Sequence, residues 1–349
     1  MLRRCAAVLL GLIVLAGGGC AGNGAGKGAD SGAGKGADKA AAGRAQRDLT
    51  ASQALRPAVS PGESLQVIDD YVARYNKAVS DADGRAWRGL LDDPMAAMAD
   101  ARLRIGHGRP PERRTTTLVN PVLFVPKLDA FPKWFVVAAM ERLGRRGKPR
   151  QVLLMFARSG PQAAWRLANI TITAAKLPKI ATDGQGYAIA VSPEAPGRLA
   201  VALGDLAAAH TTYLTNATAR TFTDGQYTTG WHARRGAWAR RLRAGGWLDT
   251  VTFGQTRYAA AALRTKDGGI LAWYAVSRVE SLVSARRSAP DPGAVSSDIR
   301  GYLDKPPGGS RTEVRAAWLL LPLTYVPTRG RPSVLGMTTG LTSAATIEH

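Results

Sequence analysis

The first twenty residues constrain this chain most, because they decide which part of it is left to fold. Arg3 and Arg4 precede an apolar run, Ala6–Ala16, which is followed by three glycines. A charged start, a short apolar core and small residues are typical of a secretory signal peptide, and the run is too short for a membrane span. We therefore predict that residues 1–19 are a cleaved signal and that the remainder acts outside the cytoplasmic membrane.

A cysteine, Cys20, follows the glycines directly. This arrangement resembles the lipobox of bacterial lipoprotein signals, although Gly17 stands where leucine is usual. The resemblance implies that Cys20 carries lipid such as palmitate and anchors the chain to the bilayer, on the outer face of the cytoplasmic membrane. An ordinary signal followed by a chance cysteine is the alternative.

Low-complexity sequence follows the cysteine over residues 20–61. The unit GAGKGAD occurs at Gly24–Asp30 and again at Gly32–Asp38. Such a polar, glycine-rich stretch cannot bury enough apolar surface to fold, so we predict a disordered tether. The only other cysteine, Cys5, leaves with the signal. The folded part therefore has no disulfide, no thiolate nucleophile and no cysteine metal site.

The chain is strongly basic, with a formal net charge of +21. Such a charge attracts anionic lipid headgroups, anionic wall polymers or nucleic acid. Because export removes the chain from nucleic acid, the expected partners besides the bilayer are an envelope protein or an anionic wall polymer. A solvated, arginine-rich surface without a partner is the alternative.

The folded part reads as two copies of one α+β plan, each a helix followed by a curved antiparallel sheet. The first copy is predicted at residues 62–180, a linker at 181–196 and the second copy at 197–349. Ile68–Tyr75 matches Leu203–His210 without a gap. Apolar residues recur at helical spacing in both segments, so each copy is predicted to open with an amphipathic helix.

Four pairs of apolar runs predict matching strands in the two copies. They are Leu118–Val125 with Leu248–Phe253, Trp134–Ala139 with Tyr258–Leu263, Val152–Phe156 with Ile270–Tyr274, and Trp165–Thr171 with Trp318–Thr324. The Asp-Gly pair in Lys266–Gly269 predicts a tight hairpin. Residues 284–311 predict a long loop insertion before the last strand. The tail from Arg329 to His349 is weakly patterned.

A helix followed by a curved meander resembles the cone-shaped nuclear-transport-factor-like and cystatin-like folds. Three stretches, Phe131–Val137, Leu177–Ala188 and Ala262–Gly269, together with the signal, resemble an uncharacterised family of actinobacterial lipoproteins. This resemblance implies the lipid at Cys20. It assigns no catalytic residue, cofactor or metal ligand.

Few residues suggest a catalytic or ligand-binding site. The four histidines lack the spacing of a zinc protease. His210 falls on the apolar face of its predicted helix, where the first copy has Tyr75, and Asp70 and Asp205 recur in both copies. These four are pocket candidates, with a buried core residue or a helix-start carboxylate as the alternative. Strand aromatics are either cleft-lining or core residues; they are Trp134, Trp165, Trp273, Tyr274 and Trp318.

Three functional hypotheses follow. The anchor, the charge, the repeat and the lack of a catalytic constellation favour a non-catalytic binding or accessory role towards a protein or an anionic envelope component. A carrier of a small molecule or lipid in the cone cavities is the second. A hydrolase or isomerase built on His210 and Asp205 is the third, and it requires the two side chains to converge in a deep cleft.

Overall fold

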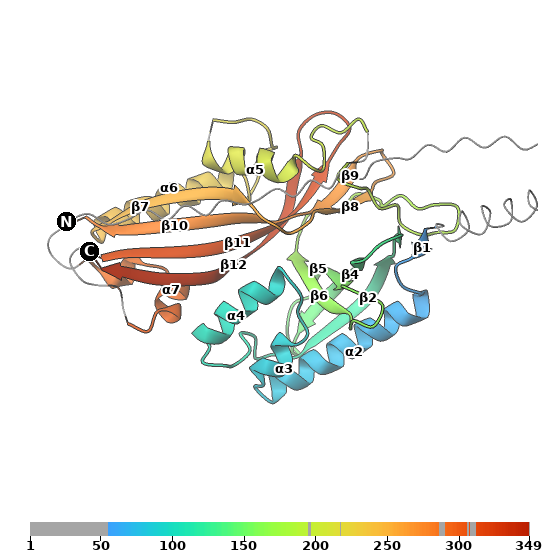
Figure 1. The fold of residues 1–349 in the computed structure, drawn as a ribbon, viewed down its shortest axis with the longest axis horizontal. Coiled ribbons are helices and arrows are strands. Elements are labelled where there is room, and N and C mark those ends of the chain that lie inside the picture. The colour runs from blue at the N-terminus through green and yellow to red at the C-terminus, as the bar shows by residue number, and fades with distance from the viewer. Residues whose placement is uncertain are drawn as a thin grey trace, which may run out of the picture. The chain divides into compact units, whose positions relative to one another are not determined.

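Two antiparallel sheets, each with helices packed against it, organise the chain in the computed structural model (Figure 1). The structure describes residues 55–194, 197–216, 218–285, 290–305, 307 and 312–348. Residues Ala54–His349 form one compact unit. The signal, Cys20 and most of the predicted tether lie outside the described residues. The last part of the tether range contains strand β1 (Arg56–Pro57), which pairs with β3 (Lys127–Leu128).

The first sheet has the strand order β2-β4-β5-β6. Its strands are β2 (Thr116–Phe124), β4 (Lys133–Leu143), β5 (Arg150–Arg158) and β6 (Arg166–Ile172), and its helices are α2 (Pro61–Ser80), α3 (Gly84–Arg88) and α4 (Met95–Ile105). Helix α2 lies across this sheet, where Tyr71 meets Phe156 edge-on with ring centroids 5.3 Å apart. The predicted first helix is confirmed. It begins at Pro61 because Ser60 caps it, accepting a hydrogen bond from the Glu63 amide.

The second sheet has the order β7-β10-β11-β9-β8, and β12 pairs with the free side of β11. Its strands are β7 (Trp247–Gln255), β8 (Ala261–Arg264), β9 (Ile270–Trp273), β10 (Val276–Ser284), β11 (Thr312–Val326) and β12 (Ser333–Glu348). Its helices are α5 (Leu206–Thr215), α6 (Thr229–Ala244), the 3-10 turn η1 (Pro292–Ala294) and α7 (Ser297–Tyr302). The predicted hairpin at Lys266–Gly269 is confirmed, because it joins the antiparallel pair β8 and β9.

The α+β class is therefore confirmed, but two tandem copies are not. The sequence matched Trp134–Ala139 with Tyr258–Leu263, yet β4 lies between two strands, whereas β8 pairs with β9 on one side and meets only an isolated bridge at Ala190 on the other among the described residues. The second helix was expected from about Leu199 and instead begins at Leu206. The Ala200 amide donates to the Pro327 carbonyl at 2.8 Å, so this stretch bonds to a distant loop rather than to a helical turn.

The tail holds a long strand that the sequence pattern did not predict. Strand β12 runs beside β11 over almost its whole length. Two of its inward positions are glycines, Gly336 and Gly340, where a β-carbon would come within 2.4 Å of Thr171 and 2.6 Å of Met98. Because the strand fits its neighbours through small residues, it lacks the alternation of large apolar and polar side chains that identifies strands in a sequence.

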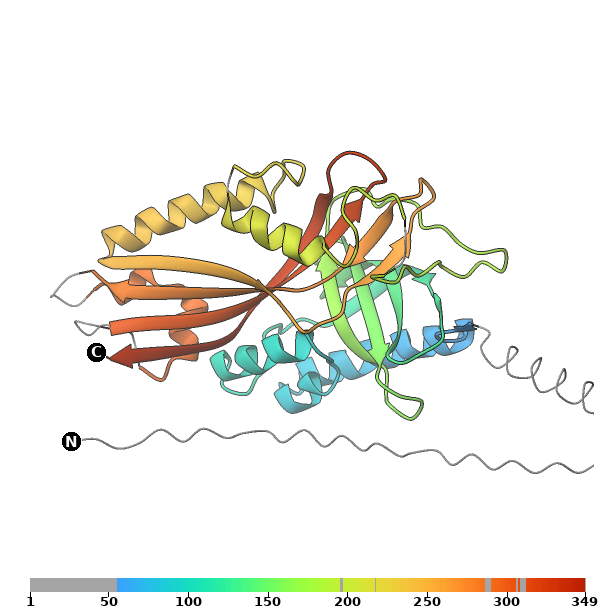
Figure 2. The same ribbon diagram turned by 45° about the horizontal axis from the view of Figure 1, so that its top comes forward.

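A shared apolar layer joins the two sheets. Figure 2 shows the first sheet beside the β8–β9 end of the second. Val136, Leu153 and Met155 of the first sheet form one buried cluster with Leu271 and Trp273 of the second. The predicted insertion lies between β10 and β11 and contains η1 and α7, with Ile299 fully buried. Within the described ranges, none of the helices combines the length and apolar character needed to cross a membrane.

Candidate ligand-binding pocket

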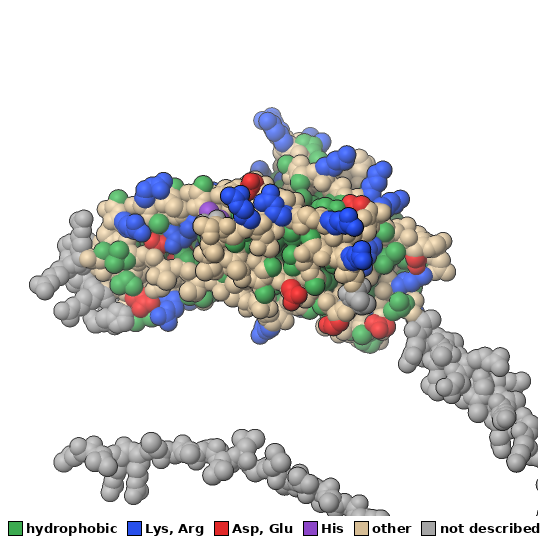
Figure 3. Space-filling model, turned by 90° about the horizontal axis from the view of Figure 1, so that it is seen from above, with side chains coloured by type: hydrophobic (Ala, Val, Ile, Leu, Met, Phe, Trp, Pro, Cys, Tyr) green, Lys and Arg blue, Asp and Glu red, His purple; other side chains and the backbone are tan. Residues whose placement is uncertain are grey.

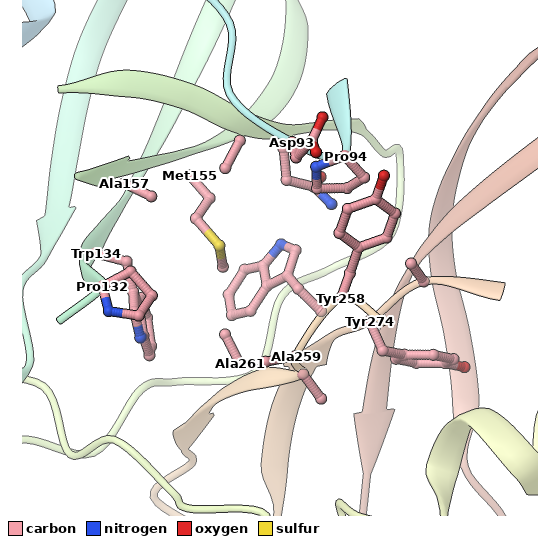
Figure 4. Close-up of a pocket in the computed structure, with 15 residues that line it drawn as sticks. Asp93, Pro94, Pro132, Trp134, Met155, Ala157, Tyr258, Ala259, Ala261 and Tyr274 are labelled. Atoms are coloured by element: carbon pink, nitrogen blue, oxygen red, sulfur yellow. The ribbon is translucent and has the colours of Figure 1, made fainter. Parts of the chain in front are cut away.

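A pocket of about 330 Å³ lies where the two sheets meet. Figure 4 shows side chains from both sheets directed towards it. The first sheet and its loops contribute Asp93, Pro94, Pro132, Trp134, Met155, Ala157, Ala168 and Asn169, and the second contributes Tyr258, Ala259, Ala260, Ala261, Trp273, Tyr274 and Ala275. The lining is therefore mostly aromatic and aliphatic.

Strand register places the large side chains of the wall. Trp134 of β4 lies directly opposite Ala157 of β5, so the two share one face of the sheet. Trp273 of β9 lies opposite Ala261 of β8 in the same way, and its exposed fraction is only 2%. Each tryptophan is thus paired with an alanine, and the small partner leaves room beside the large ring.

Few polar groups line this pocket. The Asn169 side chain accepts a hydrogen bond from the Thr171 hydroxyl at 3.1 Å. The Asp93 carboxylate pairs with the Arg257 guanidinium at 3.2 Å, and both side chains are largely open to solvent. The same guanidinium lies 5.4 Å from the centre of the Tyr258 ring. The charged pair thus lies at an exposed part of an otherwise apolar lining.

His210 lies in the core of the second sheet. Its side chain is fully buried, with Nδ1 2.8 Å from the Tyr274 hydroxyl and the ring 4.8 Å from Phe222. Nε2 has no hydrogen-bond partner within the described residues. Burial disfavours the charged imidazolium and lowers the pKa of His210 to about 3. His210 is therefore a neutral core residue at physiological pH.

The structure does not bring the four predicted pocket residues together. Asp205 precedes α5, and its side chain is exposed while His210 is enclosed. Asp70 and Tyr75 both belong to α2. Asp70 is exposed and lines a second, smaller pocket. Burial raises the pKa of the half-buried Tyr75. The cleft in which His210 and a carboxylate converge is not found in the described part of the chain.

The sequence predicted part of the lining of the pocket between the two sheets. Trp134, Trp273 and Tyr274 were among the aromatics expected to line either a cleft or the core, and all three line the pocket. Trp165 does not; its indole donates to Glu63 instead, at 3.0 Å. Tyr258 was placed in the predicted strand Tyr258–Leu263 but was not among the aromatics expected to line a cleft or the core. Among the described residues, no group of His, Cys, Asp or Glu is arranged to hold a metal ion.

Comparison with known proteins places this chain in a family. Residues 55–346 match the model of a Domain of unknown function (DUF8094). An uncharacterized lipoprotein of Streptomyces coelicolor is 30% identical over 82% of this chain and 86% of its own length. An uncharacterized lipoprotein of Streptomyces avermitilis is 28% identical over 66% and 69%. No solved structure matches. Because the match spans nearly the whole described body, the chain belongs to the DUF8094 family.

Proposed function

We propose that this protein is an envelope lipoprotein, anchored through Cys20, that binds a small and mainly apolar molecule in the pocket between its sheets. The observation that carries the proposal is the pocket itself, with its volume of about 330 Å³ and its lining of tryptophan, tyrosine, methionine and alanine. Pockets of roughly 300–1,000 Å³ with mostly apolar walls and a few polar groups are typical of small-molecule sites.

The lining indicates the kind of ligand. Trp134 and Tyr258 offer aromatic surface, and Met155 adapts its shape to an irregular partner. The Asn169 amide and the Asp93 carboxylate supply the polar contacts that orient a ligand. We therefore expect a compact, largely hydrocarbon or aromatic molecule with a polar group at one end.

The role is proposed to be non-catalytic. The enzyme hypothesis required His210 beside a carboxylate in a cleft, whereas His210 is enclosed and hydrogen-bonded to Tyr274. Binding of a protein or anionic envelope component, the first hypothesis from the sequence, remains a second candidate. The arginine-rich surface of α6 favours it.

A common origin of the two halves is also proposed, with a strand correspondence different from that expected. β2, β4, β5 and β6 are successive antiparallel neighbours, and so are β7, β10, β11 and β12 once the β8–β9 hairpin is set aside. Helices precede both sets. This correspondence matches β4 with β10 rather than β8. An experimental structure whose two four-stranded sets do not superpose would contradict it.

The ligand proposal is tested with the chain from residue 20 onward, carrying Cys20→Ser to prevent lipidation. Native mass spectrometry of this chain after incubation with an extract of the envelope fraction is expected to show a bound small molecule. In addition, the neutral fluorescent probe N-phenyl-1-naphthylamine is expected to bind and to be displaced by an extracted ligand.

A cavity-filling variant locates the binding. Ala157→Phe places a ring in the pocket and is expected to weaken probe binding at least tenfold. The matched control is Ala345→Phe on β12, where the alanine is exposed and far along the sheet from the lining residues. Equal probe binding by both variants and the parent chain would place the probe elsewhere and refute the pocket as the site.

A further inference from the structure

Helix α6 exposes a dense set of positive charges. Its sequence, TGWHARRGAWARRLRA, holds five arginines and no acidic residue. Arg234, Arg240, Arg241 and Arg243 are exposed, whereas Leu242 is the buried residue of the helix. Figure 3 looks at the side on which α5 and α6 lie, and Lys and Arg side chains are more widespread there than Asp and Glu.

The fold uses one of the five arginines and leaves the others available. Arg235 points inward and pairs with Asp249, whose side chain is only 2% exposed. Arg234 and Arg241 donate to the backbone carbonyls of Gln226 and Gly293. In the described part of the chain, no carboxylate forms an ion pair with any of the four exposed arginines. Within the described residues, these four charges are therefore not neutralised by ion pairs.

The exposed side of α6 is suited to a broad, flat partner. Ala233 and Ala237 are exposed between the arginines, and the two tryptophans of the helix are turned partly inward. Small residues leave the guanidinium groups as the most protruding atoms. A guanidinium presents several N–H donors in a planar fork that matches phosphate oxygens, so phosphodiester groups fit this surface better than isolated carboxylates.

We propose that the exposed arginines of α6 dock the body onto anionic lipid headgroups of the same membrane to which the N-terminus is anchored. Charge complementarity supports this partner, because basic residues near a bilayer are attracted by its anionic phospholipids within a Debye length. The predicted anchor supports it as well, because lipid at Cys20 would keep the body at a high effective concentration beside the bilayer.

The anchor and the helix together make a two-point attachment. Contact through α6 orients the body, while the lipid supplies most of the residence time. This inference is independent of the ligand pocket, because none of the α6 arginines lines it. Failure of either proposal leaves the other standing.

The test measures sedimentation of the unlipidated Cys20→Ser chain with lipid vesicles. Vesicles of phosphatidylcholine with about 30% phosphatidylglycerol are compared with vesicles of pure phosphatidylcholine, each at about 0.05 and 0.5 M salt. The higher salt concentration shortens the distance over which charges attract each other. Binding to the anionic vesicles at low salt is expected, with loss at high salt. If the chain bound neutral vesicles as strongly as anionic vesicles, the proposal would be overturned.

Two triple variants with the same change of charge identify the surface. Arg240→Gln, Arg241→Gln and Arg243→Gln remove charges from α6, and we expect them to weaken binding at least tenfold, since each basic residue near an anionic surface contributes substantially. Arg142→Gln, Arg145→Gln and Arg146→Gln remove exposed arginines at the β4–β5 hairpin that form no ion pair with another described residue, and should change binding less than threefold. Equal losses in both variants would show attraction by net charge alone and would overturn the α6 assignment.

A soluble polymer separates lipid from free phosphodiester. Teichoic acid, a phosphodiester polymer, is added to the vesicle assay at a phosphate concentration equal to that of the lipid. We expect the chain to remain mostly on the vesicles, because the flat surface engages several headgroups at once. Complete transfer to the polymer would overturn the membrane assignment in favour of a wall polymer.

Discussion

His210 Nδ1 lies 2.8 Å from the Tyr274 hydroxyl, and the same hydroxyl lies 3.1 Å from Thr324 Oγ1. The three residues connect α5, the residue that follows β9, and β11 within the buried core. Each supplies a hydrogen-bond partner that another needs, which is the usual condition for burying polar groups. Tyr274 also lines the pocket, so one residue connects this network to the proposed binding site.

Removing the central hydroxyl is expected to destabilise the fold. Tyr274→Phe keeps the ring but leaves His210 Nδ1 and the Thr324 hydroxyl without their buried partner, at a cost of about 1–3 kcal/mol in the free energy of unfolding. Urea denaturation monitored by circular dichroism measures the change. Tyr258→Phe is the control, because the Tyr258 hydroxyl has no hydrogen bond within the described residues; its effect should stay below about 0.5 kcal/mol.

Stability is expected to fall as the solution becomes acidic through the range set by His210. Its folded pKa of about 3 lies below the ordinary value of 6.5. The unfolded chain therefore binds a proton between these values while the folded chain does not, so protonation favours unfolding. Between pH 7 and pH 5 this single group should remove about 2 kcal/mol of the free energy of unfolding.

A pair of histidine variants checks this dependence. In His210→Phe the loss between pH 7 and pH 5 should shrink by most of that amount, whatever the absolute stability of the variant. His107→Asn changes an exposed histidine in a left-handed backbone conformation that asparagine tolerates, and should keep the wild-type dependence. An unchanged pH dependence in His210→Phe would mean that His210 is accessible to protons in the folded state.

Local sequence signals predicted those elements whose stability is local. Helix α2 follows from its apolar spacing, and the β8–β9 hairpin follows from Asp267-Gly268. Gly268 has φ +85°, a conformation that glycine adopts without strain. The conformations of this helix and this hairpin depend on a few neighbouring residues, so they can be predicted without knowledge of the tertiary structure.

Elements stabilised by distant contacts were predicted only in part: the predicted strand Trp318–Thr324 lies within β11, but the length and the partners of β11 were not predicted. β11 pairs with β10 along its first half and with β9 at its end, and no short apolar run reveals two successive partners. The pocket has the same origin. Asp93 and Tyr258 lie far apart in the sequence, yet both line the pocket, where Arg257, the neighbour of Tyr258, pairs with Asp93. Predicting such a site requires the packing of the two sheets.

The anchor prediction is testable on the intact chain. Cys20→Ser should abolish incorporation of labelled palmitate and move the protein from the membrane fraction to the medium, because a signal-cleaved chain without lipid has no hydrophobic anchor. Cys5→Ser alters a residue of the predicted signal and should leave labelling intact. Palmitate labelling that persists in Cys20→Ser and disappears in Cys5→Ser would contradict the predicted cleavage site.

The contact between β12 and the end of β6 at Gly336 is expected to be sensitive to a single methyl group. A β-carbon on Gly336 would lie 2.4 Å from a Thr171 side-chain carbon and 3.1 Å from the Ile172 carbonyl oxygen. Thr173 also donates to the Leu335 carbonyl at 2.6 Å, so the backbones are held together and cannot separate freely. Gly336→Ala should therefore cost about 1–3 kcal/mol in the free energy of unfolding.

Gly160→Ala is the matched control, since its β-carbon would meet nothing within 4 Å, and it should change stability by less than about 0.5 kcal/mol. Chemical denaturation of both variants decides the matter: a Gly336→Ala variant as stable as Gly160→Ala would mean that β6 and β12 are not in contact in solution.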